Sequence, residues 1–309
     1  MYEESLIYKV TWCYYAANMT QQEIADHLNI SRMRVVKLLN QAKSEGIIKF
    51  KIDPEAKMLI DYEQALISKF NISDAFVIPS TPTELNENLA MGAAQYIEDK
   101  IESDALINIG YGDTVSRTIN HLIYSIDKPI SLVTLTGGVS YYTSAIVSGA
   151  KKMSANNITP TIHIIPAPLL ASSEEIAHLF LEEKSIKHIL DMTKLSKMSI
   201  VGIGSVSDNA TIFKYGIADK DDLTLLKMQG AVGDILSHFF DQNGQPIESE
   251  LQKKLIGTSL DALKSSHKTI AVAGGSDKVQ AIHAALIGGY VDVLVTDQET
   301  TKALLDYPR

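Results

Sequence analysis

Four short glycine-rich segments carry the residue types that could bind a negatively charged ligand. They are Asn108–Thr114, Thr136–Gly138, Gly202–Ser205 and Ala273–Lys278. Each follows an apolar run that is typical of a buried strand, and glycine lets backbone amides approach an anion closely. Two segments end in a hydroxyl residue and one in lysine, and a helix that starts after such a turn favours negative charge. One turn of this kind would serve chain packing equally well, but four predict a pocket for a phosphate or a polyol.

Two charged residues could complete this pocket. Asp234 follows a glycine at a predicted helix start, where it could accept hydrogen bonds from sugar hydroxyls or cap the helix. Lys278 opens another predicted helix, where its charge opposes the helix dipole. An anion between this ammonium and the turn amides would remove that conflict, although Lys278 could also be an ordinary surface lysine.

Motifs of several other chemistries do not occur in the sequence. None of the glycine-rich segments reads G-x-G-x-x-G or G-x-x-x-x-G-K-[ST], which disfavours dinucleotide binding and nucleotide hydrolysis. The eight histidines lack the spacing of a metal-binding helix, and there is no G-x-S-x-G turn for a nucleophilic serine. Cys13 is the single cysteine, which excludes an internal disulfide. We therefore predict no catalytic residue, no metal and no cofactor.

The segment Met19–Gly46 points to a different chemistry. Thr20 and Glu23 have the spacing of a capping box, Asn29 suits a left-handed turn, and Ser31 suits the cap of a second helix. This order is typical of a helix-turn-helix, and an ordinary basic helix in a small bundle is the alternative. The side of the second helix opposite its apolar stripe could meet base edges and phosphates in a major groove. The predicted DNA contacts are Thr20, Gln21, Ser31, Arg32, Met33, Arg34, Val36, Lys37 and Asn40.

Charge is unevenly distributed along the 309 residues. The net charge of −9 argues against a nucleic-acid binder as a whole, but Ser31 to Lys51 contains six Lys or Arg and one acidic residue, Glu45. The acidic remainder suits a sensor domain. No signal peptide and no apolar run of about 18 residues are visible. With one cysteine, these features predict a cytoplasmic protein without a membrane partner.

The apolar periodicity predicts the elements that position these residues. A helix at 3–17 precedes the helix-turn-helix, and Ile47–Ile52 reads as a short strand like the wing of a winged helix. A helix at 57–70 could pair with its copy in another subunit or pack on its own domain. From residue 72, strands and helices alternate. The predicted strands are Ala75–Pro79, Ala105–Gly110, Ser131–Thr136, Thr161–Ile165, Met198–Ile203, Thr269–Ala273 and Val291–Thr296. The predicted helices are Glu84–Glu102, Thr114–Tyr124, Ser140–Ala155 and Lys278–Ile287.

This alternation predicts a doubly wound α/β domain, with a parallel sheet between two layers of helices. We therefore expect three parts. A (winged) helix-turn-helix DNA-binding domain occupies residues 1–53, a linker or oligomerisation helix 54–71, and an effector domain 72–309.

The motifs together resemble the SorC family of bacterial sugar-responsive transcription regulators over nearly the whole chain. In the first domain the similar segments are Met19–Ala25, Asn29–Arg32, Leu38–Leu39 and Glu45–Gly46. In the second they are Gly110–Thr114, Gly137–Gly138, Val201–Ser205, Ala231–Asp234, Phe239–Asp241, Gly274–Lys278, Ala284–Tyr290 and Leu294–Asp297. The resemblance implies a tetrameric repressor or activator whose second domain has the fold of phosphosugar isomerases and binds a phosphorylated sugar.

Carried over to this sequence, the family's effector contacts fall on Gly112, Thr114, Gly138, Asp234, Leu236 and Lys278. With the neighbouring turn residues, the predicted effector site is Gly110, Gly112, Thr114, Thr136, Gly137, Gly138, Gly204, Ser205, Asp234, Leu236 and Lys278. Two departures from the family matter. Met33–Val36 stands where Pro-Thr-Val-Ser is common, so the operator sequence should differ. Thr136 stands where some members carry a lysine, and without an amine it excludes a Schiff base there.

Two functions from different classes fit these observations. The preferred one is a DNA-binding regulator, a repressor of a carbohydrate-utilisation operon, whose affinity for double-stranded operator DNA is controlled by a phosphorylated sugar. It would act as a homo-oligomer, a dimer or a tetramer. The rival is a sugar-phosphate isomerase or deaminase with an appended DNA-binding-like module. Such an enzyme needs a general base near the sugar, and the pocket turns offer only Asp113, Asp234 and Asp277. The helix-turn-helix favours the regulator, because an isomerase has no use for it.

Overall fold

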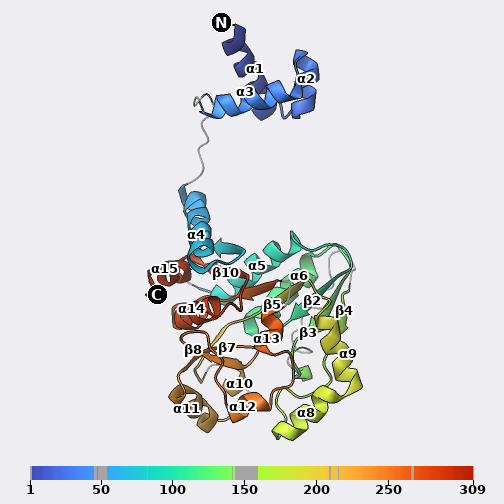
Figure 1. Ribbon diagram of the computed structural model, residues 1–309, viewed down its shortest axis with the longest axis vertical. Helices are drawn as coiled ribbons and strands as arrows, with labels where there is room; N and C mark the ends of the chain where they lie inside the picture. Colours follow the sequence, from blue (N-terminus) through green and yellow to red (C-terminus); the bar gives the residue numbers. More distant parts are fainter. Residues whose placement is uncertain are drawn as a thin grey trace. The chain divides into compact units, whose positions relative to one another are not determined.

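The computed structural model divides the chain into two compact units, Met1–Lys57 and Met58–Arg309 (Figure 1). It describes residues 2–44, 47, 54–81, 83–140, 142, 159–208, 210–214, 216–265 and 268–308. Apart from Ile47, the predicted strand at 47–52 lies outside the described residues. The same holds for the predicted helix at 140–155, of which only Ser140 and Tyr142 are described.

The first unit contains the predicted helix-turn-helix. Its helices are α1 (Tyr2–Tyr15), α2 (Gln21–Leu28) and α3 (Arg32–Ser44). The capping box is formed as expected, since the Glu23 amide donates to Thr20 Oγ1 (3.2 Å) and the Thr20 amide donates to Glu23 Oε2 (2.7 Å). Asn29 ends α2 in the left-handed conformation with φ of 55°, and Ser31 Oγ accepts from the Arg34 amide (3.2 Å). These local bonds satisfy the open ends of both helices and fix the turn between them.

One apolar cluster holds the three helices together. Its buried members are Leu6, Ile7, Val10, Ile24, Ala25, Val35, Leu38, Leu39 and Ala42. Apart from Ile7, they belong to the apolar stripes that helical periodicity predicts, whereas Ala17, which the same periodicity places on the first stripe, is exposed. Cys13 is half-buried at the edge of this cluster, which is the position of a packing residue.

Helix α4 (Pro54–Phe70) packs on the second unit through its last three turns. Leu66 is completely buried there, and Glu63 Oε1 accepts from the amide of Val77 (2.9 Å) in the first strand of the sheet. The sequence left open whether this helix packs on its own domain, and the structure shows that it does. Its role in joining subunits stays a prediction.

The end of α4 also binds the end of the chain. Lys69 Nζ donates to the carbonyls of Leu304, Leu305 and Tyr307, at 3.0, 2.8 and 2.8 Å. These residues close α15 (Gln298–Asp306), and carbonyls in the last turn of a helix have no amide partner within it. The ring of His283 stacks at 4.6 Å from that of Tyr307, and Phe70 lies 5.6 Å from His283.

A parallel sheet forms the centre of the second unit. In the described part of the chain it has seven strands, in the order β1-β10-β9-β5-β2-β3-β4. The strands are β1 (Asp74–Ile78), β2 (Ala105–Ile109), β3 (Ile130–Thr134), β4 (Thr161–His163), β5 (Met198–Val201), β9 (Thr269–Val272) and β10 (Val293–Asp297). All six pairings are parallel. Every predicted strand is present, and no strand end differs from its prediction by more than two residues.

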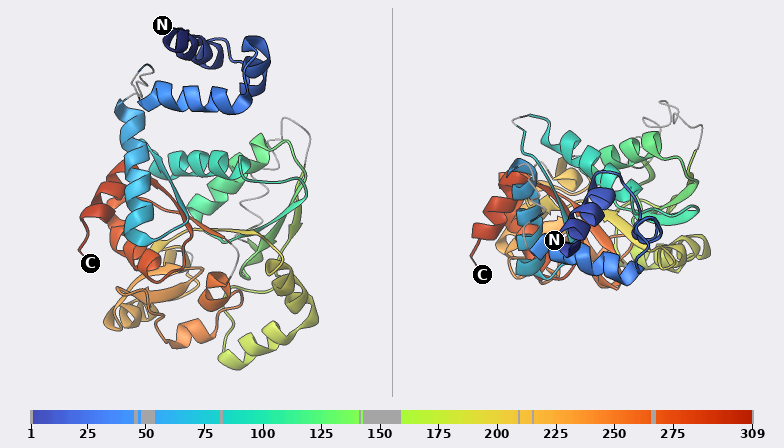
Figure 2. Two further views of the ribbon diagram at one scale, coloured as in Figure 1. Left: turned by 45° about the horizontal axis from the view of Figure 1, so that its top comes forward. Right: turned by 90° about the horizontal axis from the view of Figure 1, so that it is seen from above.

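Helices cover both faces of this sheet (Figure 2). On one face α5 (Leu85–Glu98) and α6 (Asp113–Ser125) pack against Ile270 and Val272 of β9. On the other face α4, α13 (Leu260–Lys264), α14 (Val279–Ile287) and α15 pack against Ala271 of the same strand. Alternate residues of a strand point to opposite faces, so strands covered on both faces are apolar at most positions, with buried polar exceptions such as Asn108 and Ser199. The doubly wound fold is confirmed.

The second unit also contains short helices and a second, small sheet. They include α8 (Glu174–Glu182), α9 (Lys184–Thr193), α10 (Thr211–Lys214), α11 (Lys220–Met228), α12 (Glu250–Lys253) and the 3₁₀ turn η1 (Ser276–Lys278). A small antiparallel sheet joins β6 (Gly204–Ser205), β7 (Ala231–Ile235) and β8 (His238–Asp241). The sequence did not predict this sheet. The predicted helix start at Asp234 is wrong, because Asp234 lies inside β7.

Candidate functional site

The strand order places a cavity at the carboxyl ends of β2 and β5. Strands β2, β3 and β4 run outward to one edge of the sheet, and β5 returns to the other side of β2. At such a switch point successive connections leave in opposite directions and open a crevice. The crevice holds a cavity of about 520 Å³, with walls from the β2–α6 turn, β5–β6, the β7–β8 hairpin and η1.

The β2–α6 turn forms one wall. Gly110 donates to the carbonyl of Ile200 (2.8 Å), and a side chain at Gly110 would meet Leu236 at 2.9 Å. Gly112 has φ of 127°, a conformation that favours glycine, and α6 begins at the next residue. Thr114 is buried in the first turn of α6, beside first-turn amides that have no carbonyl partner within the helix.

The small sheet positions Asp234 opposite Gly204. The two residues are paired in register between β6 and β7, and a Cβ atom on Gly204 would lie only 2.1 Å from Asp234 Oδ1. Gly204 therefore leaves the space that the carboxylate occupies, and Ser205 lines the cavity beside it. The Ser237 amide donates to Asp234 Oδ2 (3.0 Å). Burial raises the pKa of Asp234 to about 6, although this hydrogen bond and the nearby charge of Lys278 both act to lower it.

A tight turn between β7 and β8 closes the cavity next to Gly110. Its two central residues, Leu236 and Ser237, have φ of 55° and 63°. Positive φ at both central positions matches a type I′ hairpin turn, which usually contains Asn or Gly. Leu236 is buried against Gly110, and the Ser237 hydroxyl contacts the hydroxyl of Tyr111.

Lys278 lines the same cavity from η1. It is the last residue of η1 and directly precedes α14, so its predicted place at a helix start is confirmed. The side chain is half-buried. The structure thus brings Gly110, Gly112, Thr114, Gly204, Ser205, Asp234, Leu236 and Lys278 to one cavity.

The structure does not bring the second glycine-rich segment, Thr136–Gly138, to this cavity. The amides of Gly137 and Gly138 donate to the carbonyls of Ile256 and Ala167, both at 2.8 Å. A Cβ atom on Gly137 would lie 2.1 Å from a backbone oxygen, so glycine is needed there for packing. Thr136 reaches the cavity indirectly, because its hydroxyl is 2.9 Å from that of Tyr142, which is a lining residue.

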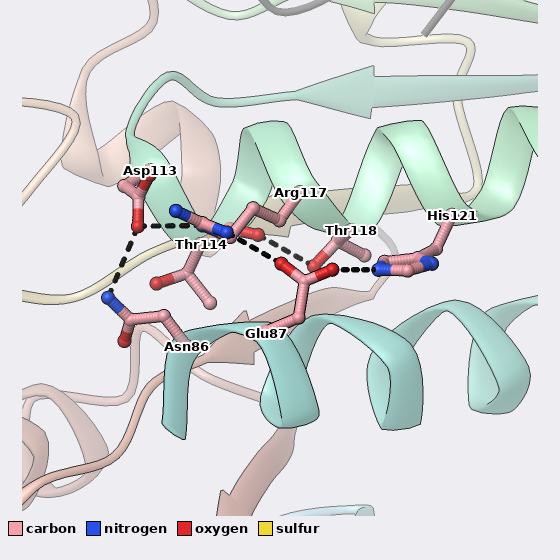
Figure 3. Close-up of polar contacts among 7 residues, drawn as sticks. All are labelled: Asn86, Glu87, Asp113, Thr114, Arg117, Thr118 and His121. Atoms are coloured by element: carbon pink, nitrogen blue, oxygen red, sulfur yellow. Dashed lines mark hydrogen bonds and ion pairs between the residues drawn. The ribbon is translucent and has the colours of Figure 1, made fainter. Parts of the chain in front are cut away.

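Sequence reasoning missed several lining residues, among them Tyr111, Asn86, Arg117 and Lys214. Arg117 stands four residues after Asp113, a spacing that could have indicated an ion pair on one helix face. Its Nε atom is 3.0 Å from Asp113 Oδ2 (Figure 3). Asn86 comes from α5 and carries no comparable sequence signal. No group of three or more His, Cys, Asp or Glu residues that could hold a metal ion occurs in the described part of the chain.

The predicted DNA-binding residues occupy an exposed side of the first unit. Met33 is 83% exposed, and Arg32, Arg34, Val36, Lys37 and Asn40 are also exposed on α3. Thr20, Gln21 and Ser31 lie at the helix starts, and Gln21 is half-buried. An exposed Met and Val between cations are the groups that contact thymine methyls and phosphates in a major groove.

Comparison with known proteins gives matches along both units. Residues 55–306 match the family described as "Putative sugar-binding domain", and residues 10–43 match the one described as "Sigma-70, region 4". The transcriptional regulator LsrR of Klebsiella pneumoniae subsp. pneumoniae is 34% identical over 308 residues, covering 98% of this chain and 93% of that protein. LsrR of Escherichia coli (strain K12) is 36% identical over 310 residues, covering 99% and 96%.

Solved structures agree with these matches. The full-length sorbitol operon regulator SorC from Klebsiella pneumoniae superposes with a TM-score of 0.71 at 25% identity, covering 98% of both chains. A DeoR family transcriptional regulator from Listeria monocytogenes gives a TM-score of 0.70 at 26% identity, covering 80% of this chain and 99% of that one. No helix among the described residues is long and apolar enough to cross a lipid bilayer.

The raised pKa of Asp234, whose residue is half-buried in β7, makes the free energy of unfolding depend on pH. Its folded pKa of about 6 exceeds the ordinary value of 3.8, so the folded chain holds the proton more tightly between these values. Asp234 should therefore raise the free energy of unfolding of the wild type as pH falls from about 6 to 3.8. Asp234→Asn removes the charge, and near neutral pH it should raise the free energy of unfolding by about 1–3 kcal/mol. The gain should vanish as pH falls from 6 to 4.

Urea unfolding of wild type and Asp234→Asn across this range measures the effect. The difference between the two proteins is the relevant quantity, because burial lowers the pKa of His238 to about 4 and shifts wild-type stability in the opposite direction. A constant difference between the two curves would contradict the prediction.

Proposed function

Because the chain belongs to the SorC family of sugar-responsive bacterial transcription regulators, we propose that it is a repressor whose operator affinity is controlled by a phosphorylated sugar. It is a transcription regulator with a helix-turn-helix unit and a sugar-binding domain, as its relatives over nearly the whole length indicate. A regulator of this kind acts on chromosomal DNA, so we place it in the cytoplasm. We further propose that its target is a carbohydrate-utilisation operon.

The juxtaposition of Lys278 with the start of α6 is the observation that supports a phosphorylated ligand. Both line one cavity, and the first-turn amides of α6 supply hydrogen-bond donors that an anion needs. Thr114 and Ser205 add hydroxyl donors on the same walls. Asp234 offers a carboxylate oxygen on the adjacent wall, which would accept hydrogen bonds from sugar hydroxyls.

The rival function, an isomerase or deaminase, is not supported. The relatives that match nearly the whole chain are transcriptional regulators. Of the three aspartates that line the cavity, Asp113 already accepts hydrogen bonds from Arg117 and Asn86. Asp234 lies in the cavity and its raised pKa would suit a proton acceptor, so steady conversion of a sugar phosphate by the protein is the result that would favour the enzyme.

Ligand binding changes transcription only through differential affinity. The protein must have one arrangement that binds the operator and another that has released it. A sugar phosphate that bound both equally well would not change operator affinity, however tight the binding. For a repressor released by its ligand, the released arrangement must bind the sugar phosphate more tightly. A screen of sugar phosphates by thermal shift identifies the ligand, because one present at about a hundred times its Kd adds about 2.7 kcal/mol of stability.

Lys278→Ala tests the effector site. We titrate the ligand from the screen into a complex of the full chain with operator DNA, and follow release of the DNA by fluorescence anisotropy. The variant should need at least about tenfold more ligand, because a charge-assisted hydrogen bond to phosphate contributes about 1.5–3 kcal/mol. Lys187→Ala is the matched control, since Lys187 is half-exposed on α9 and pairs with Glu182 at the surface. Equal ligand requirements for wild type and Lys278→Ala would remove Lys278 from the site.

Lys37→Ala and Arg34→Ala test the DNA-binding face. If Lys37 contacts a base, its loss should cost about 1–3 kcal/mol and relax preference at one position of the operator. If Arg34 contacts phosphate, its loss should weaken all sequences alike and lower the salt dependence of binding. Anisotropy titrations with the operator and single-base variants, at several salt concentrations, distinguish the two effects. Unchanged affinity and base preference in Lys37→Ala would place Lys37 outside the reading face.

We also propose that the chain assembles into a symmetric oligomer, a dimer or a tetramer, whose paired α3 helices read a two-fold-related operator. Helix α4 is a candidate contact, because its apolar residue Ile60 is 48% exposed. Light scattering of the full chain at micromolar concentration should give a multiple of the 33.9 kDa chain mass. A monomer both with and without operator DNA would contradict the proposal.

A further inference from the structure

Four charged or polar side chains join Asp113 in a network between α5 and α6 (Figure 3). Asn86 and Glu87 come from the first turn of α5. Arg117 and His121 come from α6, one and two turns after Asp113. Asn86, Asp113 and Arg117 also line the cavity, so the network forms part of its wall.

Asp113 occupies an unfavourable position for an anion site. It is the first residue of α6, beside the amides on which the proposed phosphate site depends. A free carboxylate there would itself be attracted to the helix start and would repel a phosphate. In the structure, Asp113 Oδ2 instead accepts from Arg117 Nε (3.0 Å) and Asn86 Nδ2 (3.2 Å).

Arg117 is itself held in place by α5. Its Nη1 atom donates to Glu87 Oε2 (2.6 Å), and the other oxygen of Glu87 bonds His121 Nε2 (2.8 Å). The hydrogen bond from Arg117 lowers the pKa of Glu87, so this carboxylate is ionised near neutral pH. With two carboxylates on one guanidinium, Arg117 is poorly suited to be a direct ligand for phosphate.

Stability does not account for this arrangement. The Arg117 side chain is 44% exposed and that of Asp113 is 59% exposed. Ion pairs with such exposure contribute about 0–1 kcal/mol. The effect of the network on charge at the cavity wall is direct, because without Arg117 the carboxylates of Asp113 and Glu87 would lack the cation that bonds both.

We propose that Arg117 is a positioning residue that holds the carboxylate of Asp113 away from the anion site at the start of α6. The inference rests on the proposed function, since it assumes that an anion binds there. Without a partner, the Asp113 carboxylate would weaken phosphate binding by charge repulsion. The hydrogen bonds from Arg117 and Asn86 remove this effect. Phosphate binding therefore requires Arg117 only when residue 113 is acidic.

A charge-rescue experiment tests this assignment. The full chain is titrated with inorganic phosphate by calorimetry at constant ionic strength. Arg117→Gln should weaken phosphate binding by about tenfold, because it leaves a negative charge near the site uncompensated. Asp113→Asn should bind phosphate at least as tightly as wild type, and the double variant should match Asp113→Asn. Asn86→Ala should weaken binding in the same direction but less, and Lys187→Gln, on α9, should match wild type.

The results can reject the role of Arg117 without rejecting the phosphate site. Normal binding by Arg117→Gln with weak binding by Lys278→Ala would overturn the inference and leave the phosphate site in place. A double variant as weak as Arg117→Gln would also overturn it, because Arg117 would then act without Asp113. No phosphate binding by wild type would overturn both, because no anion site would then exist at the start of α6.

Discussion

The parallel hydrogen bonding of the central sheet is the constraint on which the cavity depends. Parallel strands bring all their carboxyl ends to one edge, and the strand order separates the connections that follow β2 and β5. Residues 110 and 204 therefore face one space although some ninety positions separate them in the chain. Lys278 reaches the same space from a third strand, β9, through η1. The cavity is thus a property of the topology, and the side chains around it determine what it binds.

Much of this arrangement could be predicted from the sequence because the signals are local. Strands covered by helices on both faces are mostly apolar, so all seven were recognisable as largely apolar runs, although polar residues such as Asn108 and Ser199 interrupt them. The capping box at Thr20 and the left-handed turn at Asn29 are also local, and both are formed as predicted. Helix α14 begins where Lys278 indicated.

The sequence predictions that were wrong or missing concern segments whose structure depends on long-range contacts. Asp234 sits in a strand because β7 pairs with β6, some thirty residues earlier, and no local pattern shows that pairing. Leu236 and Ser237 form a left-handed turn without Asn or Gly, so the hairpin had no recognisable turn signal. The glycines at 110 and 137 look alike in sequence. The first admits Leu236 beside the cavity, whereas the second allows close packing against a neighbouring backbone.

The contact between Lys69 and the end of α15 couples the local unfolding of two helix ends in the second unit. One ammonium supplies the hydrogen bonds that three carbonyls at this helix end would otherwise lack. The last turn of α15 and the last turn of α4 therefore form one cooperative unit, and their amides should become accessible to hydrogen exchange in the same opening event. Through this contact, the last turn of α15 helps to hold the last turn of α4 on the second unit.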